Sequence, residues 1–217
     1  FSSIRQISSG EVMHSVNPPE QEARQLYLEQ SNLTRRLEPT DTTGELVVWD
    51  VGLGAASNAM AVLREFEAQV AIRGVAALRS LRLVSFERDL DPLRLVIRRA
   101  AYFPHVRHGA PSALLEQGHW THASGAMRWE LIPGDFLETL AAAPPPDLIF
   151  YDPFSFRTDS ALWTPAAFTR VFAACVGRPA ELYTYSAATA ARAALLSAGF
   201  FVSEGVGTGP KATTTIA

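Results

Sequence analysis

The nine residues LVVWDVGLG at positions 46–54 decide the fold class. They form an apolar run of strand length, interrupted only by Asp50, that leads at once into Gly52 and Gly54. Ser57 follows where the N-cap of a helix is expected, and apolar residues then recur at helical spacing. A buried strand that turns through glycines into a helix is the unit from which ligand-binding α/β sheets are built.

The same alternation of strand and helix patterns continues along the chain. Further strands are expected at 81–86, 129–132, 147–151 and 182–185. Helices are expected at 57–70, 165–176 and 187–197. Another helix should begin at 91, and a short one should follow the strand at 129–132 and end at about 140. Two last strands, 200–205 and 212–216, are joined by a connection too short for a crossover, so they should pair antiparallel. The pattern predicts an α/β, Rossmann-like fold of the class I SAM-dependent methyltransferase type. Its sheet should be seven-stranded and mostly parallel, with a C-terminal antiparallel hairpin.

Two segments stand apart from this alternation. Residues 1–45 precede the first strand and carry a helix near 20–31, so we expect an N-terminal extension packed on a core domain at 46–217. Residues 104–125 contain two prolines and three glycines and show no clear period. This second segment is expected to be a long insertion or a lid.

Composition narrows the functional class. Nineteen basic residues against 22 acidic ones give a net charge of −3, which argues mildly against a protein that holds nucleic acid by its overall charge. A single cysteine, Cys175, excludes a disulfide framework and a thiolate zinc site. No apolar run approaches the roughly 18 residues of a membrane span, and no signal peptide is evident, so we expect a cytoplasmic protein.

Acidic residues stand at the ends of four predicted strands, namely Asp50, Glu87, Asp135 and Asp152. Ligands of open α/β sheets bind at the carboxyl ends of the strands, so the four acids should converge on one crevice. With S-adenosyl-L-methionine as the ligand, Asp50 would face the amino group of its methionine portion. Glu87 would face the ribose hydroxyls and Asp135 the adenine amino group. Asp152 would lie beyond the cofactor, beside the substrate. The alternative for each acid is that it caps a helix and faces water.

The predicted cofactor is S-adenosyl-L-methionine rather than a dinucleotide. The dinucleotide fingerprint requires a third glycine where this chain has Ser57. An acid before the first glycine suits the cationic amino group of methionine better than a pyrophosphate. A nicotinamide-dependent dehydrogenase is therefore the weakest of the interpretations that we considered.

Several motifs are similar to those of a known family. They are the MHS run at 13–15, EAR at 22–24, LEQSNL at 28–33, DVGLG at 50–54 with Asn58, VSFE at 84–87, YDPF at 151–154, LWT at 162–164, YTYS at 183–186, AGF at 198–200 and the closing 205–211 segment. The chain resembles the methyltransferase domain of MnmC-type enzymes and its stand-alone relatives. Departures occur at 153–160 and at Ala212, where the family has other residues.

The resemblance implies that the chain uses SAM to methylate the aminomethyl group on the wobble uridine of certain tRNAs. Whether a separate enzyme supplies the aminomethyl uridine is left open by the sequence. It implies a cofactor site of Asp50, Gly52, Gly54, Asn58, Glu87, Gly134 and Asp135. Asp152 is the candidate catalytic residue, which would orient the amine and accept its proton. Tyr151, Phe154 and Trp163 are candidates for stacking on an unpaired base, and Lys211 and His14 complete the expected substrate site.

Other interpretations remain open. One alternative is a methyltransferase that acts on a small-molecule amine or another metabolite. The other is a module that binds SAM without catalysis. Four histidines at 105, 108, 119 and 122 suggest a metal site, but prolines and glycines make a continuous helix unfavourable there, so no metal is expected. The arginines to inspect for phosphate contacts fall into two groups: Arg35, Arg36, Arg73, Arg79 and Arg82, and then Arg94, Arg98 and Arg99.

Overall fold

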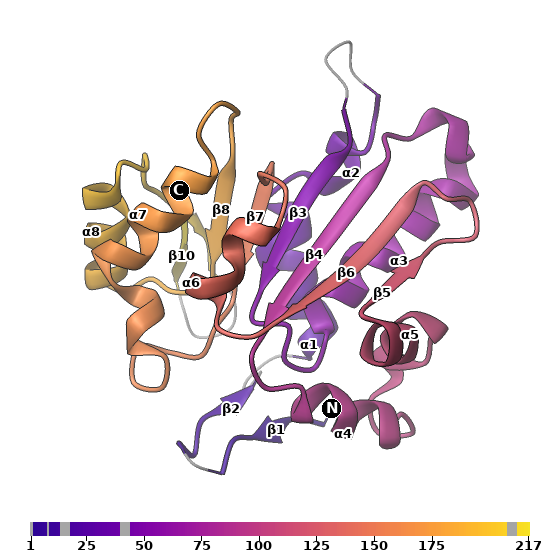
Figure 1. Cartoon of the computed structure of the whole chain (residues 1–217), viewed down its shortest axis with the longest axis horizontal. Helices are drawn as coiled ribbons and strands as arrows, with labels where there is room; N and C mark the ends of the chain where they lie inside the picture. Colours follow the sequence, from indigo (N-terminus) through magenta and orange to yellow (C-terminus); the bar gives the residue numbers. More distant parts are fainter. Residues whose placement is uncertain (1, 8, 14–17, 40–43, 208–211) are drawn as a thin grey trace.

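A twisted eight-stranded sheet runs through the centre of the computed structural model, which describes residues 2–7, 9–13, 18–39, 44–207 and 212–217 (Figure 1). The strand order is β5-β6-β4-β3-β7-β8-β10-β9. The strands are β3 (Leu46–Val51), β4 (Leu81–Glu87), β5 (His119–Thr121), β6 (Met127–Pro133), β7 (Leu148–Tyr151), β8 (Glu181–Thr184), β9 (Ser203–Val206) and β10 (Thr213–Ile216). The five strands from β6 to β8 are parallel, and β5, β9 and β10 make the antiparallel pairings.

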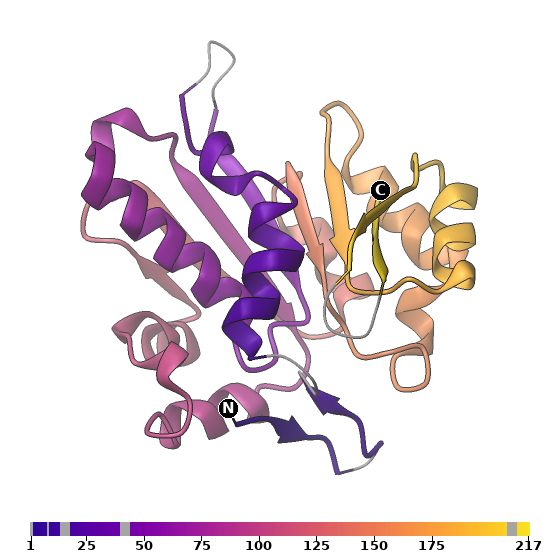
Figure 2. The same ribbon diagram turned by 180° about the vertical axis from the view of Figure 1, so that it is seen from behind.

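Helices cover both faces of the sheet, as Figures 1 and 2 show from opposite sides. One face carries α1 (Pro19–Ala23), the π-helical segment η1 (Arg24–Glu29), α2 (Leu33–Arg36), α3 (Ser57–Arg73) and α5 (Gly109–Gln117). The other carries α6 (Phe136–Thr139), α7 (Pro165–Ala174) and α8 (Thr189–Ala198). Near the carboxyl ends of the strands lie α4 (Asp91–Arg98) and a small hairpin of β1 (Ile4–Arg5) and β2 (Val12–Met13). Short 3₁₀ turns are η2 (Val75–Ala77), η3 (Pro104–Val106), η4 (Leu140–Ala142) and η5 (Ser160–Trp163).

The two faces of β3 explain why its sequence is apolar throughout. All six residues of this strand are buried. Leu46 and Val48 belong to the core under α3, whereas Trp49 and Val51 belong to the core under α7 and α8. A central strand of a parallel sheet is covered on both sides, so it lacks the alternation of polar and apolar residues found in half-exposed strands. The predicted doubly wound α/β class is confirmed.

The strand count of seven is corrected to eight by β5, which lies within the segment at 104–125. That segment was expected to be irregular, yet it holds η3, α5 and β5. The His108 side chain accepts a hydrogen bond from the Ala110 N–H at the start of α5, Pro111 lies in the first turn, and Gly118 ends the helix with φ +77°. Proline and glycine are tolerated at helix ends, so they do not break this helix.

The N-terminal helices share a core with the sheet. Leu26, Leu33 and Leu37 are at most 2% exposed and lie in the same cluster of buried side chains as Val48 and Leu83. Gln30 extends this contact to the last hairpin, because its Oε1 accepts a hydrogen bond from the Val206 N–H at 2.7 Å. None of the helices in the described ranges is long and apolar enough to cross a membrane.

Leu33→Ala tests how strongly this N-terminal packing stabilises the fold. Leu33 is fully buried, so its truncation should lower the free energy of unfolding by about 2–5 kcal/mol. Leu196→Ala is the matched control, because Leu196 is 57% exposed and its loss should change stability by about 0.5 kcal/mol or less. Urea unfolding followed by circular dichroism measures both. Equal effects for the two variants would contradict the shared core.

Candidate active site

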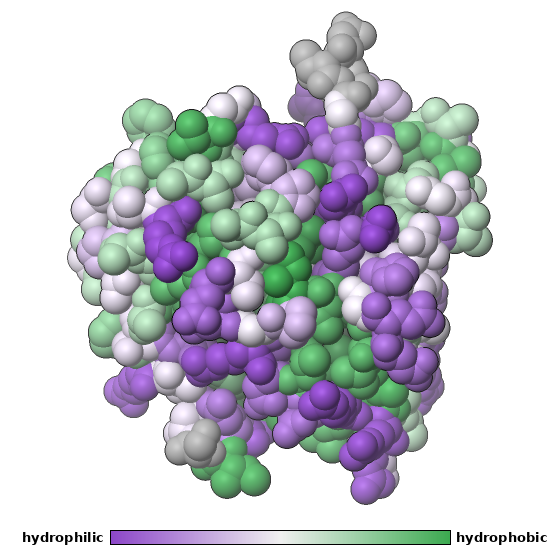
Figure 3. Space-filling model, viewed as in Figure 1, coloured by the Kyte–Doolittle hydropathy of each residue, from purple (hydrophilic) through white to green (hydrophobic). Residues whose placement is uncertain are grey.

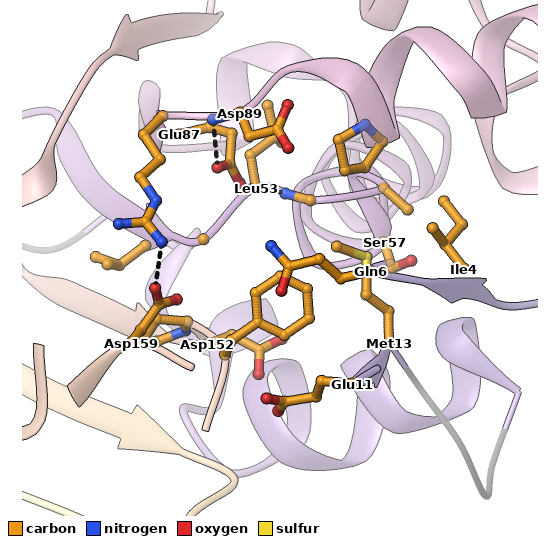
Figure 4. Close-up of a pocket in the computed structure, with 18 of the residues that line it drawn as sticks. Ile4, Gln6, Glu11, Met13, Leu53, Ser57, Glu87, Asp89, Asp152 and Asp159 are labelled. Atoms are coloured by element: carbon orange, nitrogen blue, oxygen red, sulfur yellow. Dashed lines mark hydrogen bonds and ion pairs between the residues drawn. The ribbon is translucent and has the colours of Figure 1, made fainter. Parts of the chain in front are cut away.

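A cavity of about 1100 Å³ opens at the carboxyl ends of β3, β4, β6 and β7 (Figure 4). Its walls are the loops that follow these strands, the start of α4 and the β1–β2 hairpin. The residues predicted from the sequence that line it are Gly52, Gly54, Asn58, Glu87, Gly134, Asp135, Asp152 and Phe154. The strand order reverses between β3 and β7, so the cavity lies at the topological switch point of the sheet.

Gly52 is the point where the loops after β3 and β7 meet. Its φ is +90°, and a Cβ atom on it would lie 2.7 Å from the backbone oxygen of Asp152 and 3.1 Å from the Cα of Pro153. No side chain fits there without moving the second loop. Gly52 was expected to let the backbone come close to a ligand. In the structure, the space that a side chain at this position would fill is occupied by the loop that carries Asp152, the candidate catalytic residue.

Asp50 lies beneath the glycine loop rather than on the cavity wall. It is 1% exposed, and its Oδ2 accepts a hydrogen bond from Ser85 Oγ at 2.7 Å, which in turn accepts one from Trp129 Nε1 at 2.9 Å. Its Oδ1 has no hydrogen-bond partner among the described residues. Burial raises the pKa of Asp50 to about 7, the Ser85 bond opposes this, and the charges of Asp152 and Glu87 add to it. Its expected contact with an ammonium group stays a prediction.

Asp152 is held by the first turn of α3. The Asn58 side chain donates from Nδ2 to Asp152 Oδ2 at 2.7 Å. Burial and then the nearby Asp152 carboxylate raise the pKa of Tyr27 well above its ordinary value. Asn58 Oδ1 and Ser57 Oγ are buried without a hydrogen-bond partner among the described residues, and both residues line the cavity. Unpartnered buried polar atoms beside a cavity are the atoms that a polar ligand would satisfy.

Glu87 and Asp135 form the side of the cavity next to β4 and β6. Glu87 accepts hydrogen bonds from the Gly54 N–H and the Asp89 N–H, both at 2.9 Å, and burial nevertheless raises its pKa. Asp135 accepts a hydrogen bond from the Leu137 N–H at 2.8 Å and so caps α6. Asp135 therefore caps a helix and also lines the cavity, and its expected contact with adenine stays a prediction.

The loop after β7 is fastened by its carbonyl oxygens. Tyr185 Oη donates to the Pro153 oxygen at 3.1 Å, and Trp163 Nε1 donates to the Phe154 oxygen at 2.8 Å. Tyr151, in turn, donates to the Leu162 oxygen at 2.5 Å. These hydrogen bonds hold the backbone of the loop that carries Asp152.

Tyr151 and Trp163 require a correction, because stacking on a base was expected of them. Both are buried in the core under α7, at 0% and 5% exposure, and neither lines the cavity. The reason is the pleat of β7, which turns Tyr151 to the same face as Ile149. Phe154 does line the cavity. His14 and Lys211 lie outside the described residues.

The β1–β2 hairpin crosses the cavity and is tied to the loop after β7. The Glu11 carboxylate accepts hydrogen bonds from the Ser155 N–H and Ser155 Oγ, both at 2.9 Å, and from Thr158 Oγ1 at 2.5 Å. Burial raises the pKa of Glu11, but these bonds outweigh it and the pKa lies below its ordinary value. Met13 packs 3.5 Å from the Cβ position of Gly54. Sequence reasoning missed Glu11, because its partners lie more than 140 residues away.

The cavity has a strongly acidic lining. Among the described residues, eight carboxylates line it, against two arginines, Arg5 and Arg88. The acids are Glu11, Glu22, Glu87, Asp89, Asp91, Asp135, Asp152 and Asp159. Such a lining repels phosphate groups and favours cations. The described part of the lining therefore disfavours the pyrophosphate of a dinucleotide.

The four histidines at 105–122 have separate contacts. Buried His105 lies 2.8 Å from the Ala55 oxygen through Nε2 and so supports the glycine loop from behind. His108 caps α5, and His119 and His122 contact residues two positions away in the chain. Among the residues that the structure describes, no group of three or more His, Cys, Asp or Glu side chains could hold a metal ion.

The chain is similar to known methyltransferases in sequence and in fold. A family model described as S-adenosyl-L-methionine-dependent methyltransferase matches residues 101–217. The chain is 30% identical, over 93% of its length, to the tRNA 5-methylaminomethyl-2-thiouridine biosynthesis bifunctional protein MnmC of Aeromonas hydrophila. It is 28% identical, over 88% of its length, to the protein of the same name from Stutzerimonas stutzeri. The chain spans about a third of each relative, 32% and 29% of their lengths.

A solved structure shares the fold. The crystal structure of MNMC2 from Aquifex aeolicus superimposes with a TM-score of 0.71, at 19% sequence identity, over 99% of this chain and 66% of that one. At this identity the likeness concerns the fold. It extends over the N-terminal region as well as the sheet.

Gly52→Ala tests the close approach of the two loops. The added methyl group would press on the Asp152 backbone, so we expect a loss of about 2 kcal/mol or more in the free energy of unfolding. Gly109→Ala is the control, because nothing lies within 4 Å of its Cβ position. Denaturant unfolding of both variants gives the comparison. A Gly52→Ala protein as stable as the control would show that the loops can separate freely.

Asp50→Asn tests the buried carboxyl group. Its pKa is raised in the folded state, so the folded protein binds more protons than the unfolded chain, and stability should fall as pH rises from about 4 to about 7. Asparagine can still accept the Ser85 hydrogen bond but does not titrate. The variant should therefore lose this part of the pH dependence in thermal melts recorded between pH 4 and 8. An unchanged slope would contradict the assignment.

Proposed function

Since the chain belongs to the S-adenosyl-L-methionine-dependent methyltransferase family, we propose that it N-methylates the aminomethyl group of a modified wobble uridine in tRNA. The names of the matched relatives, which refer to tRNA 5-methylaminomethyl-2-thiouridine biosynthesis, support this acceptor. The observation that carries the proposal is the place of Asp152. This carboxylate lies at the switch point of the sheet, lines the cavity and is held by Asn58.

The residues around the cavity fit the cofactor. SAM supplies a methyl group activated by a sulfonium centre. Glu87, beside the Gly54 N–H, is proposed to hold the ribose hydroxyls, and Asp135 with Gly134 the adenine. The unpartnered oxygens of Asn58 and Ser57 offer hydrogen-bond sites to the methionine portion, while Asp50 adds negative charge from below. The acidic lining favours both the sulfonium and the ammonium charge.

Asp152 is the proposed catalytic residue. A primary ammonium group must lose a proton before its nitrogen lone pair can attack a methyl group. Asp152 would accept this proton and keep the neutral amine oriented, while Asn58 fixes the direction of the carboxylate through the bond to Oδ2. A carboxylate is a weak base, so most of the acceleration would come from alignment of the amine. Phe154 on the cavity wall offers an apolar contact for the uracil ring.

The structure bears on the alternative acceptors as well. An enclosed pocket beneath residues 104–125 would favour a small metabolite, but among the described residues none from this segment lines the cavity. The volume of the cavity, about 1100 Å³, exceeds what a small amine requires beside the cofactor. We further propose that a separate enzyme supplies the aminomethyl group and that the protein acts in the cytoplasm.

Asp152→Asn is the direct test of the proposed function. Transfer of labelled methyl from SAM to an anticodon stem-loop that carries 5-aminomethyluridine should fall by about 10²–10⁴-fold, because the proton acceptor is lost. Calorimetric binding of S-adenosylhomocysteine should persist. Glu138→Gln is the matched control and should retain activity, because Glu138 is an exposed residue of α6.

Three results would redirect the proposal. Full activity of Asp152→Asn would reject the catalytic role of this carboxylate. Methylation of small amines by the wild type, with none of the stem-loop, would favour the metabolite alternative. Binding of S-adenosylhomocysteine without any transfer would indicate a binding module.

A further inference from the structure

We propose that the exposed face of α4 and the turn after it, residues 94–102, form the surface that binds the phosphate backbone of the acceptor RNA. This inference rests on the proposed function and adds to it the position of the RNA. The surface consists of Arg94, Arg98 and Arg99 with Leu95 and Tyr102, and we call it the α4 surface. It lies at the lower edge of the molecule in Figure 3, where hydrophilic side chains gather over α4.

The α4 surface is continuous with the mouth of the cavity. Asp91, Pro92 and Leu95 of the same helix line the cavity. Arg98 and Arg99 follow Leu95 by three and four residues, so they lie on the same side of the helix, one turn further from the cavity. In the described part of the cavity lining, the basic residues are Arg5 on β1 and Arg88 before α4. An RNA strand along α4 could therefore place one base in the cavity.

The arginines of the two groups differ in their ion pairs. Four of the five arginines in the first group form ion pairs around the amino ends of the strands: Arg36 with Glu181, Arg73 with Glu38, Arg79 with Asp147 and Arg82 with Glu45. These four are engaged within the protein and lie at the end of the sheet opposite the cavity. Arg35, on α2, forms none with a described acid. On α4, Arg94 pairs with Asp91, but Arg98 and Arg99 have no ion pair with any described acid. Their charges are therefore available to a partner.

The turn after α4 is held by side-chain hydrogen bonds and presents an aromatic ring. Arg107 donates hydrogen bonds from Nε to the Ala100 oxygen and from Nη2 to the Ala101 oxygen, both at 2.8 Å. Tyr102 follows and is 67% exposed, and Leu95 is 43% exposed. Exposed aromatic and apolar side chains between arginines are the composition that single-stranded RNA loops contact by stacking and by phosphate pairing.

The charge distribution assigns the phosphates to this surface rather than to the cavity. The eight carboxylates of the cavity lining repel a phosphate, whereas residues 88–107 carry five arginines against two aspartates. A chain with a net charge of −3 can thus attract RNA locally. The acidic interior would then admit the uncharged base with its cationic aminomethyl group and exclude the backbone.

The test compares Arg98→Gln/Arg99→Gln with a matched control, Arg35→Gln/Arg170→Gln. The control removes two exposed arginines from α2 and α7 that do not line the cavity, so both variants lose the same charge. Binding of the anticodon stem-loop is measured by fluorescence anisotropy at several salt concentrations. The slope of log K against log salt should become shallower by about 1.5 in the α4 variant, because each phosphate contact contributes about 0.7–0.9. The control should keep the wild-type slope.

Other outcomes separate the inference from the function on which it rests. Equal slopes and affinities for the two variants, with a wild type that binds and methylates the stem-loop, would overturn the α4 surface alone. Absence of stem-loop binding by a wild type that binds S-adenosylhomocysteine would overturn the proposed function. Displacement of the stem-loop by polyglutamate with equal efficiency to unlabelled RNA would also overturn the inference, since it would indicate a general anion surface. Affinity for S-adenosylhomocysteine checks that each variant is folded.

Discussion

The close approach of Gly52 to the Asp152 backbone is the constraint on which the site depends. A Cβ atom at position 52 would lie 2.7 Å from the Asp152 oxygen, so the loops after β3 and β7 can meet only because one of them lacks a side chain. Their meeting brings Asn58, at the start of α3, within 2.7 Å of the Asp152 carboxylate. The tyrosine and tryptophan that fasten the second loop then keep that carboxylate at the cavity.

Charge is divided between the inside and the outside of the site. Carboxylates gather in the cavity lining and directly beneath it, and burial raises the pKa of Glu87 in the lining and of Asp50 below it. Outside the cavity, Arg98 and Arg99 at the end of α4 have no ion pair with a described acid, whereas Arg94 pairs with Asp91. On the proposed function, cationic groups would therefore bind inside the cavity and phosphates on the α4 surface. The net charge of the chain, which is −3, conceals this division.

The sequence predicted the strands of the central sheet more accurately than the segment at 104–125 and the N-terminal hairpin. The strands at 46–51 and 81–86 were predicted to within one residue, because long apolar runs between glycines and helical patterns leave few other structures. The segment at 104–125 was not predicted, since its prolines and glycines looked like helix breakers and in fact stand at the ends of α5. The β1–β2 hairpin gave no local signal, because two-residue strands carry no period.

What the sequence alone determined was the alternation of strands and helices and the presence of acids at the strand ends, since both are local properties of the chain. Tertiary structure decided which of those residues face the cavity. Asp50 turns under α3 toward Ser85 and Tyr151 turns into the core under α7, while Glu11 arrives from the N-terminal hairpin. Side-chain direction follows the pleat and packing of each strand, and long-range partners are set by the whole fold. For that reason the acids could be located in advance, but their individual contacts could not.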